Sequence, residues 1–167
     1  MFVLGIDPGM SRCGYACLEA SAGRSVRAVA FGVLTTAPSE PLPQRLATLR
    51  AELAALIAAL QPSVVAVEHV FFQVNVRTAM SVGQASGLAL AEAAAAGCDV
   101  VQYTPNEVKE AVTGWGAAGK DQVQKMVQAR LGLAQPPQPA DASDAAALAL
   151  CHLAVAPFRA RISAARR

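Results

Sequence analysis

Four acidic residues stand where apolar segments of the sequence begin or end. Asp7 closes the apolar run F-V-L-G-I-D at the start of the chain, and Glu68 follows the β-branched run S-V-V-A-V. Asp141 and Asp144 are three residues apart in D-A-S-D, so both project from one face of the first turn of a predicted helix. Each acid also has an ordinary structural interpretation, as the opening of a Pro-Gly turn, a solvated strand end or a helix cap.

Together the four carboxylates indicate a metal site. Two adjacent parallel strands would bring Asp7 and Glu68 to the same end of a sheet, where open α/β sheets place their sites. Carboxylates packed together repel one another unless they are protonated or hold cations. An all-oxygen set suits Mg²⁺ or Mn²⁺, and two such ions roughly 4 Å apart can activate a water for attack on a phosphodiester. The pattern therefore predicts a metal-dependent hydrolase.

The elements that must position these acids form an α/β fold. Strands are predicted at Phe2–Gly9, Gly14–Ala20, Ser25–Thr36, Ser63–Val67 and Asp99–Tyr103. The first three form an antiparallel meander, and crossover helices make the later strands parallel to the first. The result is a five-stranded mixed sheet flanked by helices.

Helices are predicted at Pro41–Leu60, Asn75–Ala96, Asn106–Val112, Lys120–Leu131 and Asp141–Ala156. In the second of these, Gly83 and Gly87 lie four residues apart, which favours close approach of another helix. Trp115 is expected to be a small satellite of the core, and His152 a buried, hydrogen-bonded histidine. Residues 1–156 are expected to form one domain, followed by a basic, flexible tail at 157–167.

The composition indicates one globular domain of 167 residues, because 54% of them are hydrophobic and 16% charged. No export signal or membrane-spanning run is evident, and the four cysteines lack metal-binding spacing, which favours the cytoplasm. The net charge is +2. If four of the twelve acids hold metal, eight face fourteen Lys and Arg, which leaves +6 and suits a polyanion.

Three motifs, in order along nearly the whole chain, resemble those of the RuvC Holliday-junction resolvases. They are G-I-D-P-G followed by G-Y, E-x-V-F at Glu68–Phe71, and D-A-x-D-A with A-L-A-x-x-H ending at His152. The resemblance implies a ribonuclease-H-like fold and a homodimer that makes paired, symmetric nicks in four-way DNA junctions during recombination and repair. It also implies Mg²⁺ or Mn²⁺, with two ions per site, and RuvA and RuvB as branch-migration partners.

The resemblance assigns roles by position. The catalytic and metal-binding acids are Asp7, Glu68, Asp141 and Asp144. The residues expected to bind DNA are Phe71, Arg77, Lys109 and Lys120, and of these Phe71 stacks on a base. The helix Asn75–Ala96 is the expected dimer contact.

Three alternatives stay open. A nuclease of the same fold that acts on RNA would need the same acids, and a non-catalytic junction-binding dimer would need the same basic residues. Actin-like sugar kinases and ATPases also open with a strand and D-x-G, but they need a second lobe, for which 167 residues leave no room.

Overall fold

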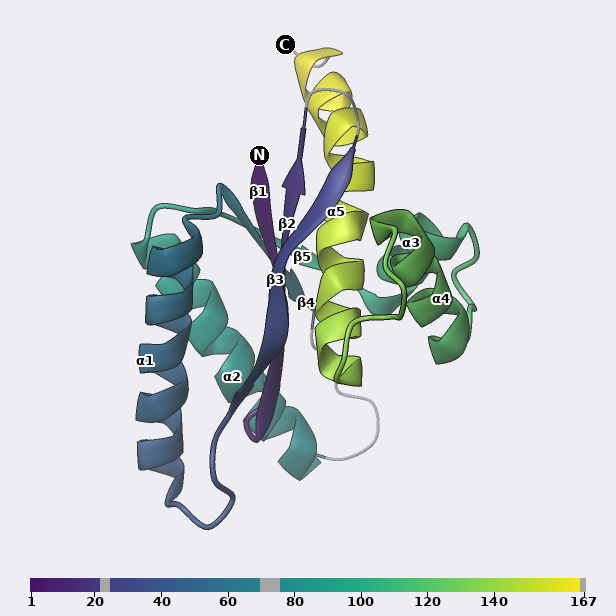
Figure 1. The fold of residues 1–167 in the computed structure, drawn as a ribbon. Helices are drawn as coiled ribbons and strands as arrows, with labels where there is room; N and C mark the ends of the chain where they lie inside the picture. The colour runs from purple at the N-terminus through teal and green to yellow at the C-terminus, as the bar shows by residue number, and fades with distance from the viewer. Residues whose placement is uncertain (22–24, 70–75, 166–167) are drawn as a thin grey trace.

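The computed structural model describes residues 1–21, 25–69 and 76–165, and gives side chains for these except at 76–78 and 158–165. Five strands and five helices make up the described chain (Figure 1). In order they are β1 (Phe2–Asp7), β2 (Arg12–Ala20), β3 (Val26–Thr35), α1 (Leu42–Leu60), β4 (Val64–Glu68), α2 (Val76–Ala95), β5 (Asp99–Tyr103), α3 (Pro105–Thr113), α4 (Lys120–Leu131) and α5 (Ala140–Ala165).

The strands form one mixed sheet in the order β3-β2-β1-β4-β5. β1, β2 and β3 are antiparallel neighbours, whereas β4 lies parallel to β1 and β5 parallel to β4. This confirms the predicted five-stranded mixed sheet. In the register of the central pair, Ile6 is opposite Val67, so Asp7 and Glu68 occupy the next positions along neighbouring strands.

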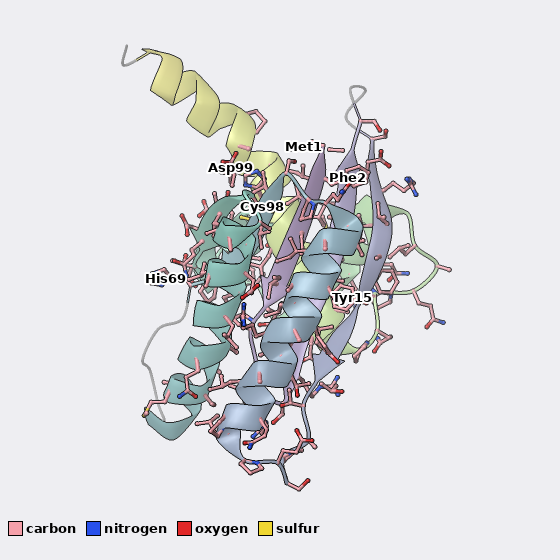
Figure 2. The ribbon with its side chains drawn as sticks, turned by 90° about the vertical axis from the view of Figure 1, so that its left-hand side faces the viewer. Met1, Phe2, Tyr15, His69, Cys98 and Asp99 are labelled. Atoms are coloured by element: carbon pink, nitrogen blue, oxygen red, sulfur yellow. The ribbon has the colours of Figure 1, made fainter. Side chains whose placement is uncertain are left out.

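The helices cover the two faces of the sheet in separate groups, with α1 and α2 on one face and α3, α4 and α5 on the other (Figure 1). Figure 2 shows α1 and α2 side by side in front of the sheet. Ile6 belongs to the core beneath α1 and α2, whereas Val3 and Ala66 belong to the core beneath α5. Because side chains alternate along a strand, Asp7 and Glu68 both fall on the face that α5 covers.

Two glycines allow α5 to lie directly on β1 and β2. A Cβ atom added to Gly5 would collide with the carbonyl oxygen of Ala145, and one added to Gly14 would collide with that of Asp141. Gly14 is also the residue paired with Asp7 across the β1–β2 ladder. The start of α5 is therefore held against the end of β1, which brings its two aspartates beside Asp7.

The C-terminal helix is longer than predicted. The sequence predicts its end at Ala156, before Pro157, but α5 continues through Pro157 to Ala165. Proline removes one backbone hydrogen bond, and the alanine-rich segments on both sides favour the helix enough to continue it. The expectation that Pro157 ends the helix is wrong, whereas the flexibility of the tail and the domain boundary stay predictions.

The structure also tests the expected roles of two side chains and of the cysteines. His152 is buried, and its Nδ1 lies 2.9 Å from the hydroxyl of Tyr103, so this prediction is confirmed. Trp115 was expected against the core but is 58% exposed, because its loop leads the side chain away from both cores. All four cysteines are described and none forms a disulfide. Within the described residues, none of the helices has the length and apolar character needed to cross a membrane.

The close contact of α5 predicts that Gly5→Ala destabilises the protein. The new methyl group has to push back the α5 backbone at Ala145, so we expect the free energy of unfolding to fall by about 1 to 3 kcal/mol. Thermal and urea denaturation measure this. Gly116→Ala is the matched control, because its Cβ would meet only the Asn106 carbonyl oxygen at an ordinary 3.7 Å. Equal stabilities of the two variants would contradict the proposed contact.

Candidate active site

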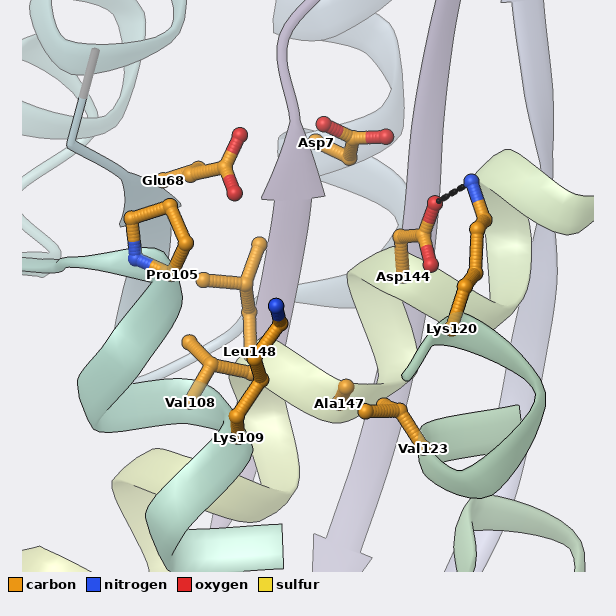
Figure 3. A pocket seen from close by; sticks show the side chains of 10 residues that line it. All are labelled: Asp7, Glu68, Pro105, Val108, Lys109, Lys120, Val123, Asp144, Ala147 and Leu148. Atoms are coloured by element: carbon orange, nitrogen blue, oxygen red, sulfur yellow. Dashed lines mark ion pairs between the residues drawn. The ribbon is translucent and has the colours of Figure 1, made fainter. Parts of the chain in front are cut away.

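A pocket of about 280 Å³ opens where β1, β4 and α5 meet (Figure 3). Asp7 enters from the end of β1, Glu68 from the end of β4 and Asp144 from the first turns of α5. Lys109 from α3 and Lys120 from the start of α4 complete its polar lining. The rest of the lining is apolar and consists of Pro105, Val108, Val123, Ala147 and Leu148. Three carboxylates and two ammonium groups therefore share one small, partly apolar space.

Both aspartates of α5 are paired with cations. The Lys120 Nζ lies 2.7 Å from Asp144 Oδ2. Arg12, at the start of β2, donates to Asp141 Oδ2 from its Nη2 at 2.7 Å and its Nε at 3.0 Å. The hydrogen bond to Asp144 raises the pKa of Lys120. These pairs are partly open to solvent, so each contributes at most about 1 kcal/mol and can exchange its cation for another.

The acids at the two strand ends, Asp7 and Glu68, both have raised pKa values. The pKa of Asp7 is raised to about 7, first by burial and then by repulsion from Glu68, Asp144 and Asp141, while Lys120 opposes the rise. Burial also raises the pKa of Glu68, with a further contribution from Asp144. The site therefore holds more negative charge than its cations balance, and an added cation would relieve the repulsion.

The structure brings most of the predicted site residues together. Asp7, Glu68, Asp144, Lys109 and Lys120 line the pocket. Asp141 lies outside its lining but near enough for its charge to raise the pKa of Asp7. Phe71 and the side chain of Arg77 lie outside the described residues.

Arg12 pairs with Asp141 although no sequence pattern predicts this contact, because a single arginine in the sequence looks like any surface charge. The hairpin register is the signal that could have found it. Asp7 pairs with Gly14, so the residues just before Gly14 lie beside the end of β1. The apolar lining from α3 was also not expected, because α3 is short and its packing depends on the whole fold.

The donor set at this site fits a divalent metal ion by its chemistry, because hard cations prefer carboxylate oxygens. Among the described residues, no three acidic, histidine or cysteine side chains are close enough to hold an ion as they stand. In the present arrangement Lys120 supplies the positive charge at Asp144. Asp7, Glu68 and Asp144 are the pocket residues whose carboxylates would hold such an ion.

Comparison with known proteins places these residues in a family. The protein-family model described as crossover junction endodeoxyribonuclease RuvC matches residues 3–152. The chain belongs to the RuvC family. The crossover junction endodeoxyribonuclease RuvC of Moorella thermoacetica is 50% identical over 161 residues, which cover 96% of each chain. RuvC nucleases are metal-dependent, in agreement with the carboxylate set.

Solved RuvC structures share this fold. Thermus thermophilus RuvC superposes with a TM-score of 0.86 at 36% identity, covering 95% of this chain and 96% of that one. A second structure, of T. thermophilus RuvC in complex with Holliday junction substrate, gives the same TM-score at 34% identity and the same coverage. The ribonuclease-H-like fold and the RuvC resemblance predicted from the sequence are thereby confirmed.

The raised pKa of Asp7 predicts a pH-dependent stability in metal-free buffer. Between its ordinary value of 3.8 and about 7, folded Asp7 keeps a proton that the unfolded chain has lost, so the free energy of unfolding falls as the pH rises through this range. We expect Asp7→Asn to remove most of this fall and to stabilise the protein at pH 7.5 by about 1 to 3 kcal/mol.

Thermal melts in EDTA from pH 4.5 to 8 measure this effect. Asp99→Asn is the matched control, because Asp99 is exposed at the opposite end of the sheet, near Met1 and Phe2 (Figure 2). If wild type and Asp7→Asn lose stability in parallel as the pH rises, the titration of Asp7 is not the cause of the pH dependence.

Proposed function

We propose that this chain is a structure-selective endonuclease that resolves four-way DNA junctions by paired, symmetric nicks. One observation carries the proposal: acids from β1, β4 and α5 converge with two lysines in a single pocket. Membership of the RuvC family and the likeness to T. thermophilus RuvC, solved with a Holliday junction substrate, support it. The junction is therefore the proposed substrate, in homologous recombination and DNA repair.

Asp7, Glu68 and Asp144 are the proposed ligands of Mg²⁺ or Mn²⁺, with two ions per site and Asp141 as a further ligand. Divalent ions held by these residues would supply the activation of a water for in-line attack and the stabilisation of the leaving oxygen. The positions of these acids would determine where the positive charge of the ions lies relative to the DNA backbone. Glycine contacts along α5 hold the helix against β1 and so keep Asp144 on the same side of the sheet as the two strand acids.

The two pocket lysines have separate proposed tasks. The ammonium group of Lys109 projects into the pocket in Figure 3 and can attract the scissile phosphate. Lys120 pairs with Asp144 in the structure, and it would be available to the phosphate if that carboxylate held a metal ion instead. Both lysines line the same pocket as the three acids, so a phosphate bound there would lie within reach of both ammonium groups.

The remaining DNA contacts are proposed from position. Phe71 follows Glu68 by three residues in the sequence and, by its place in the family's E-x-V-F motif, is our candidate for stacking on a base at the crossover. Arg77, at the start of α2, is a candidate backbone contact.

We propose that the active form is a homodimer through α2. Met80, Gly83 and Gly87 share one face of this helix, Met80 is 59% exposed, and the space around both glycines is open. A second copy of α2 can approach closely there. A twofold dimer presents two identical sites, which matches the two equivalent strands of a four-way junction.

The wider setting is proposed on the same grounds. Residues 1–156 would act as one nuclease domain, with RuvA and RuvB as partners that move the branch point. The absence of disulfides among the four cysteines fits work in a reducing cytoplasm.

Incubation with synthetic substrates tests the proposed function directly. A mobile four-way junction, linear duplex and an RNA–DNA hybrid are each incubated with the chain, with and without Mg²⁺ or Mn²⁺. We expect symmetric, ligatable nicks in the junction alone and only with metal. Cleavage of the hybrid instead would favour a ribonuclease, and junction binding without cleavage under every condition would favour a non-catalytic dimer.

Replacing a strand acid should separate cleavage from binding. Glu68→Gln keeps the shape but removes a charge, so we expect junction cleavage to fall by roughly 100-fold or more, a loss of about 3 kcal/mol of transition-state stabilisation. Junction binding should persist or tighten, because repulsion of the phosphates is relieved.

The matched control is Glu52→Gln, an exposed glutamate on α1, which packs on the other face of the sheet. Gel-shift and cleavage assays on both variants give the comparison. Cleavage by Glu68→Gln at the rate of the control would remove Glu68 from the reaction.

A further inference from the structure

The loop between α3 and α4 presents an aromatic side chain to solvent. Trp115 is 58% exposed, and it is the only tryptophan in the chain. Burial of an aromatic ring stabilises a protein by roughly 2 to 3 kcal/mol. A loop that exposes such a ring to solvent does not gain this free energy. Such a side chain calls for a partner that the isolated chain lacks.

The backbone of this loop is fixed on both sides of Trp115. The Trp115 N–H donates to the Thr113 hydroxyl at 3.1 Å, and that hydroxyl lies 2.7 Å from the Lys109 carbonyl oxygen. Beyond the tryptophan, the buried Ala118 donates its N–H to the Trp115 carbonyl oxygen at 3.0 Å. The ring therefore projects from an ordered turn, and ordering it on a ligand costs little backbone entropy.

The turn also lies beside the pocket. It joins the two helices that carry Lys109 and Lys120, six residues after the first and five before the second. A Cβ on Gly116 would lie 3.7 Å from the Asn106 carbonyl oxygen, so the turn folds back onto the start of α3, next to the pocket residue Pro105. A DNA strand with its phosphate near the two lysines would bring a neighbouring nucleotide to this turn.

We propose that Trp115 stacks on an unpaired base of the DNA strand bound in the pocket, one or a few nucleotides from the scissile phosphate. The inference rests on the proposed function and adds a second stacking point to it, on the α3–α4 side. An indole ring on the turn that joins the helices of Lys109 and Lys120 suits a nucleotide chain, because the ring can stack on a base while the ammonium groups attract the phosphates. Trp115 is thus a positioning residue that holds the strand while the acids act.

The intrinsic fluorescence of Trp115 tests this contact directly, because the chain has no other tryptophan. The full-length chain is titrated in EDTA, which prevents cutting, with an unlabelled four-way junction and separately with linear duplex. We expect the junction to quench the emission by a third or more at saturation, and the duplex to have a smaller effect. Unchanged emission at a junction concentration that gel shift shows to be saturating would overturn the inference.

Two variants provide an independent readout. We expect Trp115→Ala to weaken junction binding by about 5- to 100-fold and Trp115→Phe by less than 3-fold, since phenylalanine still stacks. The dependence of binding on salt should stay the same in both, because it reports phosphate contacts. Their melting temperatures should match the wild type, because the side chain is exposed.

The outcomes separate this inference from the proposed function. If the wild-type chain cuts junctions but Trp115→Ala binds them as tightly as wild type, the stacking role is wrong and the function stands. If the wild-type chain neither binds nor cuts junctions, the proposed function itself fails.

Discussion

The close approach of α5 to β1 and β2 is the constraint on which the site depends. Gly5 and Gly14 leave no side chain between the sheet and the helix backbone, so the first turns of α5 lie directly against the end of β1. Alternation along β1 and β4 turns Asp7 and Glu68 toward the same helix. A wider helix–sheet separation would keep the fold but move Asp144 away from the strand acids. Packing at two glycines is therefore a condition of the chemistry.

This packing forces like charges together, and the surrounding residues only partly offset the repulsion. Lys120 and Arg12 pair with the two helix aspartates, whereas burial and neighbouring carboxylates raise the pKa values of Asp7 and Glu68. The packing of the rest of the fold offsets the unfavourable free energy of these closely spaced acids. The carboxylates of Asp7, Glu68 and Asp144 would hold a divalent ion, whose charge would offset this repulsion, so the electrostatic cost of the acids favours metal binding.

Much of this was predictable from the sequence, and the exceptions share a cause. Apolar runs ending in Asp7 and Glu68, with two aspartates opening a late helix, predicted a mixed sheet that brings the two strand acids to the same end, and the resemblance of three motifs predicted the family. Those features are local and periodic. The Arg12–Asp141 pair and the exposure of Trp115 depend instead on where distant segments lie relative to one another. Residue types alone do not report such distances.

The central claim is that α5 and the strand ends together form one metal-binding site. Anomalous diffraction from crystals of the chain soaked in Mn²⁺ tests it most directly. We expect anomalous density between the carboxylates of Asp7, Glu68 and Asp144, with the Lys120 ammonium group released from Asp144. Density that lies elsewhere, or none among these three acids at saturating Mn²⁺, would contradict the account.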